Sequence, residues 1–195
     1  APGSLALLAA LQANPSQFLS AKKVAFTRSR KELVTLALIR LAATDPSAAA
    51  KFMDHKWGFQ LSTEERNWVW GVIGKQSAIR FSSPGSDALA YFDRVSADGS
   101  LTDDMLSWKT RAALRADDQP RWPLVLSSIN TMSSSARQDP TWVYWKARAL
   151  LAATPTPTAA KRAEALALYQ SIASVRGFYE QLALEELGQL VTVPA

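Results

Sequence analysis

The sequence predicts an all-α fold, an α-solenoid or superhelix of stacked antiparallel helix hairpins with about 10 helices. Three observations indicate this fold. Apolar residues recur at helical spacing, as at Leu101, Met105, Trp108 and Ala112, which step by 4, 3 and 4. No stretch alternates with period two, as a half-buried strand would. Alanine, the best helix former, recurs throughout, and a tryptophan-marked pattern repeats along the chain.

Local signals place the individual helices in order. Asp45-Pro46 and Asp139-Pro140 each put an N-cap acceptor before a proline at the first helical position. Ser62-Thr63-Glu64-Glu65 matches a capping box, and Asp103-Asp104 puts two carboxylates in a first turn, where the helix dipole favours them. We therefore expect helices near 4–12, 15–20, 28–43, 46–56, 63–80, 85–96, 102–116, 120–132, 140–153, 158–174 and 178–190, the first two readable as one broken helix.

An internal repeat is the most informative feature. Trp108-Lys-Thr-Arg-Ala-Ala-Leu114 aligns with Trp145-Lys-Ala-Arg-Ala-Leu-Leu151 at an offset of 37 residues. Asp87-Ala-Leu-Ala-Tyr-Phe92 aligns with Glu164-Ala-Leu-Ala-Leu-Tyr169 at an offset of 77, about two periods. A period in the mid-thirties with two helices per unit is typical of an α-solenoid, whose hairpins bury their apolar faces only by stacking. We interpret the tryptophans mainly as core residues of the helix seams, and Arg111 and Arg148 as covering those seams. A sugar-stacking role for Trp142 or Tyr144 is the less favoured alternative.

Composition bounds the possibilities further. The 195 residues are 48% hydrophobic, which excludes a disordered chain, and we expect one domain over residues 1–195. No apolar run approaches the roughly 18–20 residues that span a bilayer, so no transmembrane segment is expected. The absence of cysteine removes disulfides, thiol nucleophiles and cysteine-ligated metals. The first residues, Ala1-Pro2-Gly3-Ser4, lack a methionine and a charged signal-peptide start, so they indicate a processed chain or a piece of a longer one.

The net charge of +5 is uneven. The segment 22–40 contains six basic residues and a single acidic one, Glu32. The basic residues are Lys22, Lys23, Arg28, Arg30, Lys31 and Arg40. Such a stretch could attract an anionic polymer, while a solvated helix face is the commoner explanation of a charge run.

No catalytic constellation stands out. The single histidine, His55, is interpreted as a partly exposed helix-end residue, and no metal site or cofactor is expected. The chain has no Gly-x-Ser-x-Gly elbow, and Gly71 and Gly74 lie inside a helical pattern without the Lys-Ser/Thr of a phosphate loop. Adjacent carboxylates such as Glu185-Glu186 diverge by about 100° on a helix, so they are poor acid–base partners across a substrate. The residues alone therefore predict a helical scaffold with a binding function and no recognisable catalytic site.

Three segments of the C-terminal half, taken in order, resemble a known family: Trp108-Lys-Thr-Arg-Ala-Ala-Leu-Arg-Ala-Asp117, Trp142-Val-Tyr-Trp-Lys-Ala-Arg-Ala-Leu150, and Arg176-Gly-Phe-Tyr-Glu-Gln-Leu-Ala-Leu-Glu-Glu-Leu-Gly188. They are similar to the superhelical, U-shaped domain of the soluble periplasmic lytic transglycosylases. The Gly-Phe-Tyr element is the most specific piece. The resemblance is clear from about Leu101 to Gly188 and weaker before that.

The resemblance implies an enzyme family that cleaves peptidoglycan between N-acetylmuramic acid and N-acetylglucosamine and leaves 1,6-anhydromuramoyl ends. In that family one glutamate, followed by serine, acts as acid and then base, with a Gly-Leu-Met-Gln-type element further on. No glutamate precedes a serine here and no Gly-Leu-Met-Gln is present. We therefore expect a fragment that carries the helical scaffold without the linker and lysozyme-like catalytic domains, so that this chain itself is no enzyme.

Partners and location follow from the same resemblance. We expect glycan strands of peptidoglycan and the catalytic domain of the parent chain as partners, no nucleic acid, and a periplasmic location. The residues proposed to bind glycan are Lys22, Lys23, Arg28, Arg30, Lys31, Arg111 and Arg148. Two alternatives stay open: a repeat module that binds a protein partner in its concave groove, and an enzyme with an unrecognised site.

Overall fold

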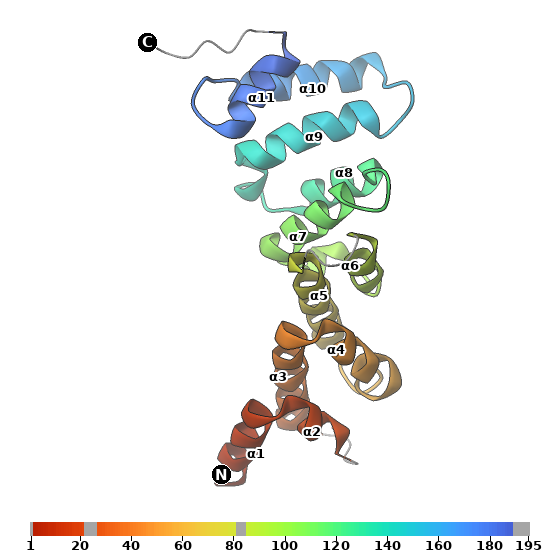
Figure 1. Ribbon diagram of the computed structural model, residues 1–195, viewed down its shortest axis with the longest axis vertical. Helices are drawn as coiled ribbons and strands as arrows, with labels where there is room; N and C mark the ends of the chain where they lie inside the picture. The colour runs from red at the N-terminus through yellow and green to blue at the C-terminus, as the bar shows by residue number, and fades with distance from the viewer. Residues whose placement is uncertain (1, 22–26, 81–84, 189–195) are drawn as a thin grey trace. The chain divides into compact units, whose positions relative to one another are not determined.

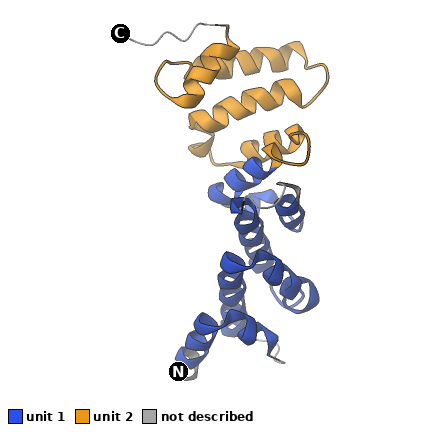
Figure 2. Cartoon of the chain, viewed as in Figure 1, with its two compact units in different colours: residues 1–112 blue, residues 113–195 orange. Residues whose placement is uncertain are grey.

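The computed structural model describes residues 2–21, 27–80 and 85–188, and all regular secondary structure in those ranges is helical (Figure 1). The all-α prediction is confirmed. The chain divides into two compact units, residues 1–112 and 113–195, with the boundary inside helix α7 (Figure 2). Each unit is described by itself below, and the expected single domain over residues 1–195 stays a prediction.

Unit 1 is a succession of helices in which neighbours along the chain pack on one another. Its elements are α1 (Pro2–Ala13), α2 (Pro15–Ser20), α3 (Arg28–Thr44), α4 (Pro46–Phe52), the π-helix η1 (Met53–Trp57), α5 (Thr63–Ile79), α6 (Gly85–Phe92), the 3₁₀ turn η2 (Asp98–Ser100) and α7 (Asp103–Leu114). Helix α3 packs against α1, α2, α4 and α5, and α5 continues the series to α6. This is the stacking that the repeat predicts.

The predicted caps begin the helices where the sequence placed them. Asp45 accepts a hydrogen bond from the backbone N–H of Ala48 at 2.9 Å and starts α4. The Ser62 hydroxyl accepts from the Glu65 N–H at 3.2 Å, and the Glu65 carboxylate accepts from the Ser62 N–H at 2.7 Å. The capping box is thus complete at the start of α5, and two of its orphan donors are satisfied.

One predicted helix, over residues 46–56, changes type at its end. The α-helical part stops at Phe52, and the chain continues as a π-helix in which the Gly58 N–H donates to the Met53 carbonyl at 3.0 Å. A β-carbon on Gly58 would lie 2.6 Å from that carbonyl oxygen, so glycine is required by close approach. The indole Nε1 of Trp57 donates to the Leu19 carbonyl at 3.1 Å and ties η1 to α2.

Two glycines let α5 approach its neighbours closely. A β-carbon at Gly71 would lie 2.7 Å from Leu101 Cδ2 and Met105 Sδ, and one at Gly74 would lie 2.9 Å from three ring carbons of Phe92. All three of these partner side chains are buried. The two glycines therefore serve helix packing, as their place inside a helical pattern indicates.

Unit 2 contains the second copy of the tryptophan pattern. Its elements are α8 (Trp122–Thr131), the 3₁₀ turn η3 (Ala136–Gln138), α9 (Pro140–Ala152), α10 (Ala159–Ile172) and α11 (Phe178–Glu186). Helix α9 packs against α8, α10 and α11, and α10 packs against α11. The core holds Tyr144 and Tyr169 among the small side chains of Ala147, Ala165 and Ala183, so the helices meet at short range.

Gly177, the N-cap residue before α11, has φ of 116°, a conformation that favours glycine over any residue with a β-carbon. It belongs to the Gly-Phe-Tyr element that carried the resemblance. The special backbone at this position explains why a glycine stands there.

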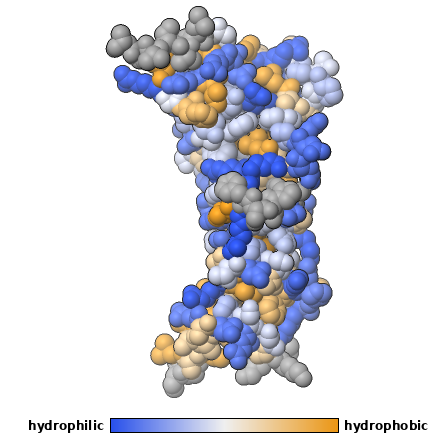
Figure 3. Space-filling view, in the orientation of Figure 1, coloured by the Kyte–Doolittle hydropathy of each residue, from blue (hydrophilic) through white to orange (hydrophobic). Residues whose placement is uncertain are grey.

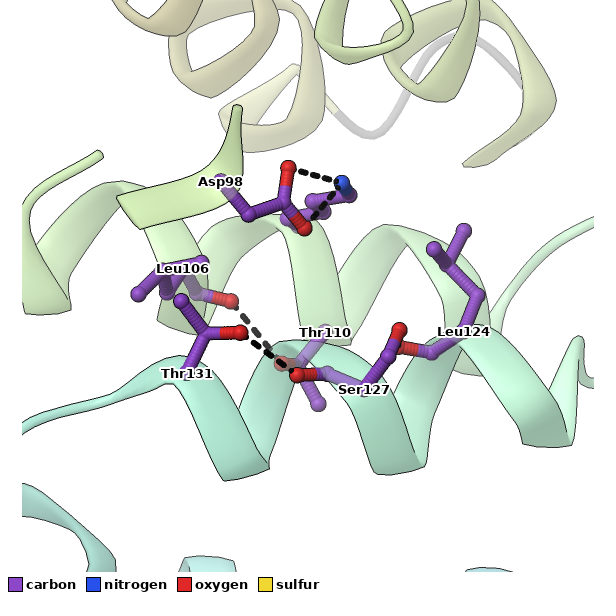
Figure 4. A network of polar contacts seen from close by, with 7 residues as sticks. Asp98, Leu106, Thr110, Leu124, Ser127 and Thr131 are labelled. Carbon is purple, nitrogen blue, oxygen red and sulfur yellow. Dashed lines mark hydrogen bonds and ion pairs between the residues drawn. The ribbon is translucent and has the colours of Figure 1, made fainter. Parts of the chain in front are cut away.

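Burial confirms the repeat at the level of single positions. In both copies the tryptophan is half-buried (Trp108, Trp145), the arginine three residues later is half-buried, and the next residue is a fully buried alanine, Ala112 or Ala149. The lysine after the tryptophan makes an ion pair in each copy: Lys109 with Asp98, and Lys146 with Glu164. Asp98 and its two contacts are among the polar contacts drawn in Figure 4. The pattern is therefore a structural repeat.

Candidate functional site

The predicted glycan-binding residues near the N-terminus lie at and before the start of α3. Lys22 and Lys23 are outside the described residues. Arg28 is exposed, and its Nε donates to the Glu32 carboxylate at 3.0 Å. Arg30 lines a cavity of about 70 Å³ beside Trp57, and Lys31 is half-buried. Part of this basic segment is therefore engaged in packing within unit 1.

The two repeat arginines have intramolecular partners. The Arg111 guanidinium lies 4.9 Å from the centre of the Trp108 ring, and its Nη1 donates to the Ser107 hydroxyl at 2.9 Å. Arg148 donates to the Glu186 carboxylate at 2.5 Å and so joins α9 to α11. Arg148 therefore bridges two helices, whereas these two partners of Arg111 lie on its own helix, α7. The glycan-binding role of all seven basic residues stays a prediction.

A hollow of about 530 Å³ in unit 1 is lined by the end of α3, the start of α4, the end of α5 and α6. Two of its polar groups, Asp45 and Arg80, already serve the fold. Asp45 caps α4, and the Arg80 guanidinium donates to the carbonyls of Ala43 and Thr44 at 2.8 and 2.7 Å. This hollow is therefore a weaker binding-site candidate, despite its volume, than a smaller pocket in which some polar groups keep unused donors or acceptors.

A second hollow, of about 220 Å³, has such groups. We call it the Phe59 pocket; its lining includes Asp54, Phe59, Arg66, Asn67, Trp70 and Arg94. The π-helix supplies Asp54, the loop after it supplies Phe59, and α5 supplies the next three residues. Pockets that bind small molecules combine aromatic walls with a few polar groups in this way. Phe59 is 81% exposed, whereas Trp70 forms a buried wall.

The polar side of the Phe59 pocket is ordered by Arg94. Its guanidinium forms an ion pair with the Asp54 carboxylate and lies 4.7 Å from the centre of the Trp70 ring. Asn67, 4% exposed, donates to the hydroxyls of Ser96 and Ser100 at 2.9 and 3.2 Å and accepts from the Ser96 N–H at 3.0 Å. The Asn67 contacts hold Ser96 and Ser100 against α5.

Arg66 is the uncommitted cation of the pocket. Its Nη2 donates to the Thr63 hydroxyl at 3.2 Å, and within the described part of the chain it contacts no carboxylate. Its guanidinium therefore keeps donors for an acceptor from outside.

Sequence reasoning missed this pocket. In the pocket, residues 53–70 lie against Arg94 and Ser96. A helical pattern does not predict which residues far apart in the sequence come into contact. One signal was available: Phe59 is a large apolar residue between two helices, flanked by Gly58 and Gln60. The side chains considered for sugar stacking, Trp142 and Tyr144, are both buried, so neither offers an open ring face.

Other site classes find no support in the described residues. No three His, Cys, Asp or Glu side chains there are placed to hold a metal ion, and His55 is exposed on the π-helix. Among the helices that the structure describes, none combines the length and apolar character needed to cross a membrane. On the face shown in Figure 3, hydrophobic and hydrophilic residues are interspersed. Exposed large apolar side chains elsewhere include Leu166 and Phe178.

Comparison with known proteins gives an informative match to a solved structure. No protein-family model matches the sequence, and no curated protein is significantly similar to it. A solved structure is similar over 96% of this chain, with a TM-score of 0.72 and 27% sequence identity. It is that of Slt from Pseudomonas aeruginosa, solved as an inactive mutant. The neighbour is a lytic transglycosylase.

The match extends the resemblance found in the sequence. That resemblance was clear from about Leu101 onward, and the structural match covers nearly all of the chain, including unit 1. This chain spans 29% of the length of the transglycosylase. The comparison supports the predicted family and the helical fold.

Proposed function

We propose that this chain is a non-catalytic helical scaffold of a peptidoglycan lytic transglycosylase, which helps to enclose or bind glycan strands. The parent enzyme would cleave MurNAc–GlcNAc bonds to 1,6-anhydromuramoyl ends in the periplasm, and its catalytic domain would be a partner of this scaffold. The observation that carries the proposal is the similarity to Slt over 96% of the chain, with a TM-score of 0.72.

Several features support a binding role without chemistry of its own. The sequence has one histidine, no cysteine and no Glu-Ser pair, so the acid–base glutamate that the resemblance implies is not in this sequence. The net charge of +5 would attract the carboxylates of peptidoglycan stem peptides, and salt would weaken that attraction. The Phe59 pocket offers an open ring and an uncommitted guanidinium.

Two assays on purified murein sacculi test the proposal. In a turbidity assay the chain should clear no sacculi, and measured clearing would mean that it carries its own active site. In a sedimentation assay the chain should be retained by insoluble peptidoglycan. Failure of retention would overturn glycan binding and favour the alternative of a module for a protein partner.

A charge-matched pair of variants separates specific from general attraction. One variant neutralises the six basic residues of the segment 22–40 named above. The other neutralises six elsewhere: Lys51, Arg121, Arg137, Lys161, Arg162 and Arg176. We expect retention to fall more in the first variant. Equal loss in both would remove the assignment of Lys22, Lys23, Arg28, Arg30 and Lys31 as glycan-binding residues.

A further inference from the structure

We infer that the Phe59 pocket is a subsite for a sugar ring that carries a carboxylate. The inference rests on the proposed function, which it deepens by assigning one site and one ligand chemistry to the scaffold.

The first step is the open ring of Phe59. At 81% exposure it is the most exposed large apolar side chain in the described part of the protein. Single exposed apolar residues are common and need no ligand. This one lines a concave surface together with the Trp70 ring and the polar side chains of Asp54 and Arg66. A flat apolar ring beside polar groups suits the C–H face of a pyranose, which has hydroxyls at its edge.

The second step is the charge distribution. Arg94 and Asp54 neutralise each other, and Arg94 is also held on the Trp70 ring. Among the described residues the Arg66 side chain has only the Thr63 hydroxyl as a partner, so there the pocket carries one uncompensated positive charge on a planar fork of donors. Such a fork matches a carboxylate, to which it can donate two parallel hydrogen bonds. The second oxygen of Asp54, Oδ2, has no protein donor in the described residues and can accept from a hydroxyl or an amide.

The third step is the backbone. The π-helix η1 ends at Trp57, and Gly58 follows it, where a β-carbon would lie 2.6 Å from the Met53 carbonyl oxygen. Single π-helical turns cost stability and occur frequently at functional sites. Here the π-helix supplies Asp54 and is followed immediately by Phe59. The irregular segment therefore contributes both an acceptor and the ring.

The test is an amide NMR titration of the full chain with three probes. They are the GlcNAc–MurNAc disaccharide with its free lactyl carboxylate, uncharged chitobiose, and the dipeptide L-alanyl-γ-D-glutamate. We expect the first probe to shift the amides of residues 53–67 and to bind about tenfold more tightly than chitobiose, the ratio for one charge-assisted hydrogen bond. Absence of shifts in residues 53–67 would overturn the inference. Dipeptide binding equal to that of the disaccharide would replace it with an acidic-peptide site.

Two variants locate the contacts. Phe59→Ala should weaken disaccharide binding about tenfold. Arg66→Gln should abolish the preference over chitobiose, and Arg66→Lys should restore it in part, since lysine keeps the charge without the fork. The matched controls are Phe178→Ala and Arg176→Gln in unit 2, whose side chains are also exposed. Equal affinity in Phe59→Ala or Arg66→Gln and their controls would overturn the assignment.

Sedimentation with sacculi separates this inference from the proposed function. If the wild-type chain is retained while Phe59→Ala and Arg66→Gln are retained equally, the scaffold function stands and the Phe59 pocket does not serve it. If the wild-type chain is not retained and the disaccharide shifts no amide, both fail.

Discussion

The ammonium of Lys109 lies 2.8 Å from each carboxylate oxygen of Asp98, and the Lys109 side chain is 5% exposed. This buried ion pair holds η2 against α7. Its counterpart in the second copy of the repeat, Lys146 with Glu164 at 3.3 Å, is much more open to solvent. The same lysine of one sequence pattern therefore has two different environments.

That difference predicts unequal costs of removing the carboxylate. Asp98→Ala would leave a buried ammonium without a partner and should lower the free energy of unfolding by about 2–4 kcal/mol. Glu164→Ala removes a solvent-screened pair and should cost less than about 1 kcal/mol. Urea unfolding measures both. Equal costs would mean that burial does not control the strength of these pairs.

Replacement of Gly74 by alanine should destabilise unit 1 although it raises helix propensity. The gain in propensity is about 1 kcal/mol, but the new β-carbon would press on the buried Phe92 ring, and overpacking costs about 1–3 kcal/mol. Thermal unfolding should therefore show a lower midpoint. Gly99→Ala is the control, because a β-carbon there meets no atom within 4 Å. A raised midpoint for Gly74→Ala would contradict the close approach of α5 and α6.

The two core tyrosines of unit 2 should respond oppositely to loss of the hydroxyl. Tyr169 has a buried hydroxyl that finds no hydrogen-bond partner among the described residues, so Tyr169→Phe should be neutral or stabilising by up to about 1 kcal/mol. The Tyr144 hydroxyl donates to Glu186 at 3.3 Å, so Tyr144→Phe should cost about 1 kcal/mol. Urea unfolding of the two variants compares them directly, and a larger loss for Tyr169→Phe would reveal a partner for its hydroxyl.

Alkaline pH should unfold unit 2 through the same residues. Burial, assisted by the Glu186 carboxylate, raises the pKa of Tyr169, and burial raises the pKa of Tyr144. The unfolded chain releases these protons near the ordinary pKa of 10.0, while the folded chain retains them to higher pH. Their contribution to stability is therefore complete below pH 10.0 and is lost as the pH rises above it. The unfolding midpoint followed against pH should fall there, and Tyr169→Phe should flatten the fall. An unchanged slope in that variant would exclude Tyr169 as the cause.

Asn67, which lines the Phe59 pocket, should contribute to the free energy of unfolding. Asn67→Ala removes the side chain that joins α5 to Ser96 and Ser100, and we expect a loss of about 1–3 kcal/mol in urea unfolding. Gln170→Ala, which removes an exposed amide on α10, is the control and should have almost no effect. A loss no larger than that of the control would mean that water replaces the amide without cost.

The sequence predicted the helices well because their signals are local. Asp45, Ser62 and Asp139 cap the helices that they were expected to cap, since a cap is a contact between residues two or three positions apart. The site was harder to predict. The pairing of Arg148 with Glu186 was not predicted, because the two residues are 38 positions apart and no spacing rule reveals such a pair. The Phe59 pocket depends equally on contacts between distant segments.

The π-helix at Met53–Trp57 has a consequence for comparing related chains. A π turn accommodates one residue more than an α turn, so deleting a single residue here would restore regular helix and rotate the following loop by about 100°. Phe59 would then leave the hollow while the helix count stayed the same. In an alignment, a one-residue gap between Met53 and Gly58 should therefore mark homologues that have lost the subsite, even where every other helix is retained.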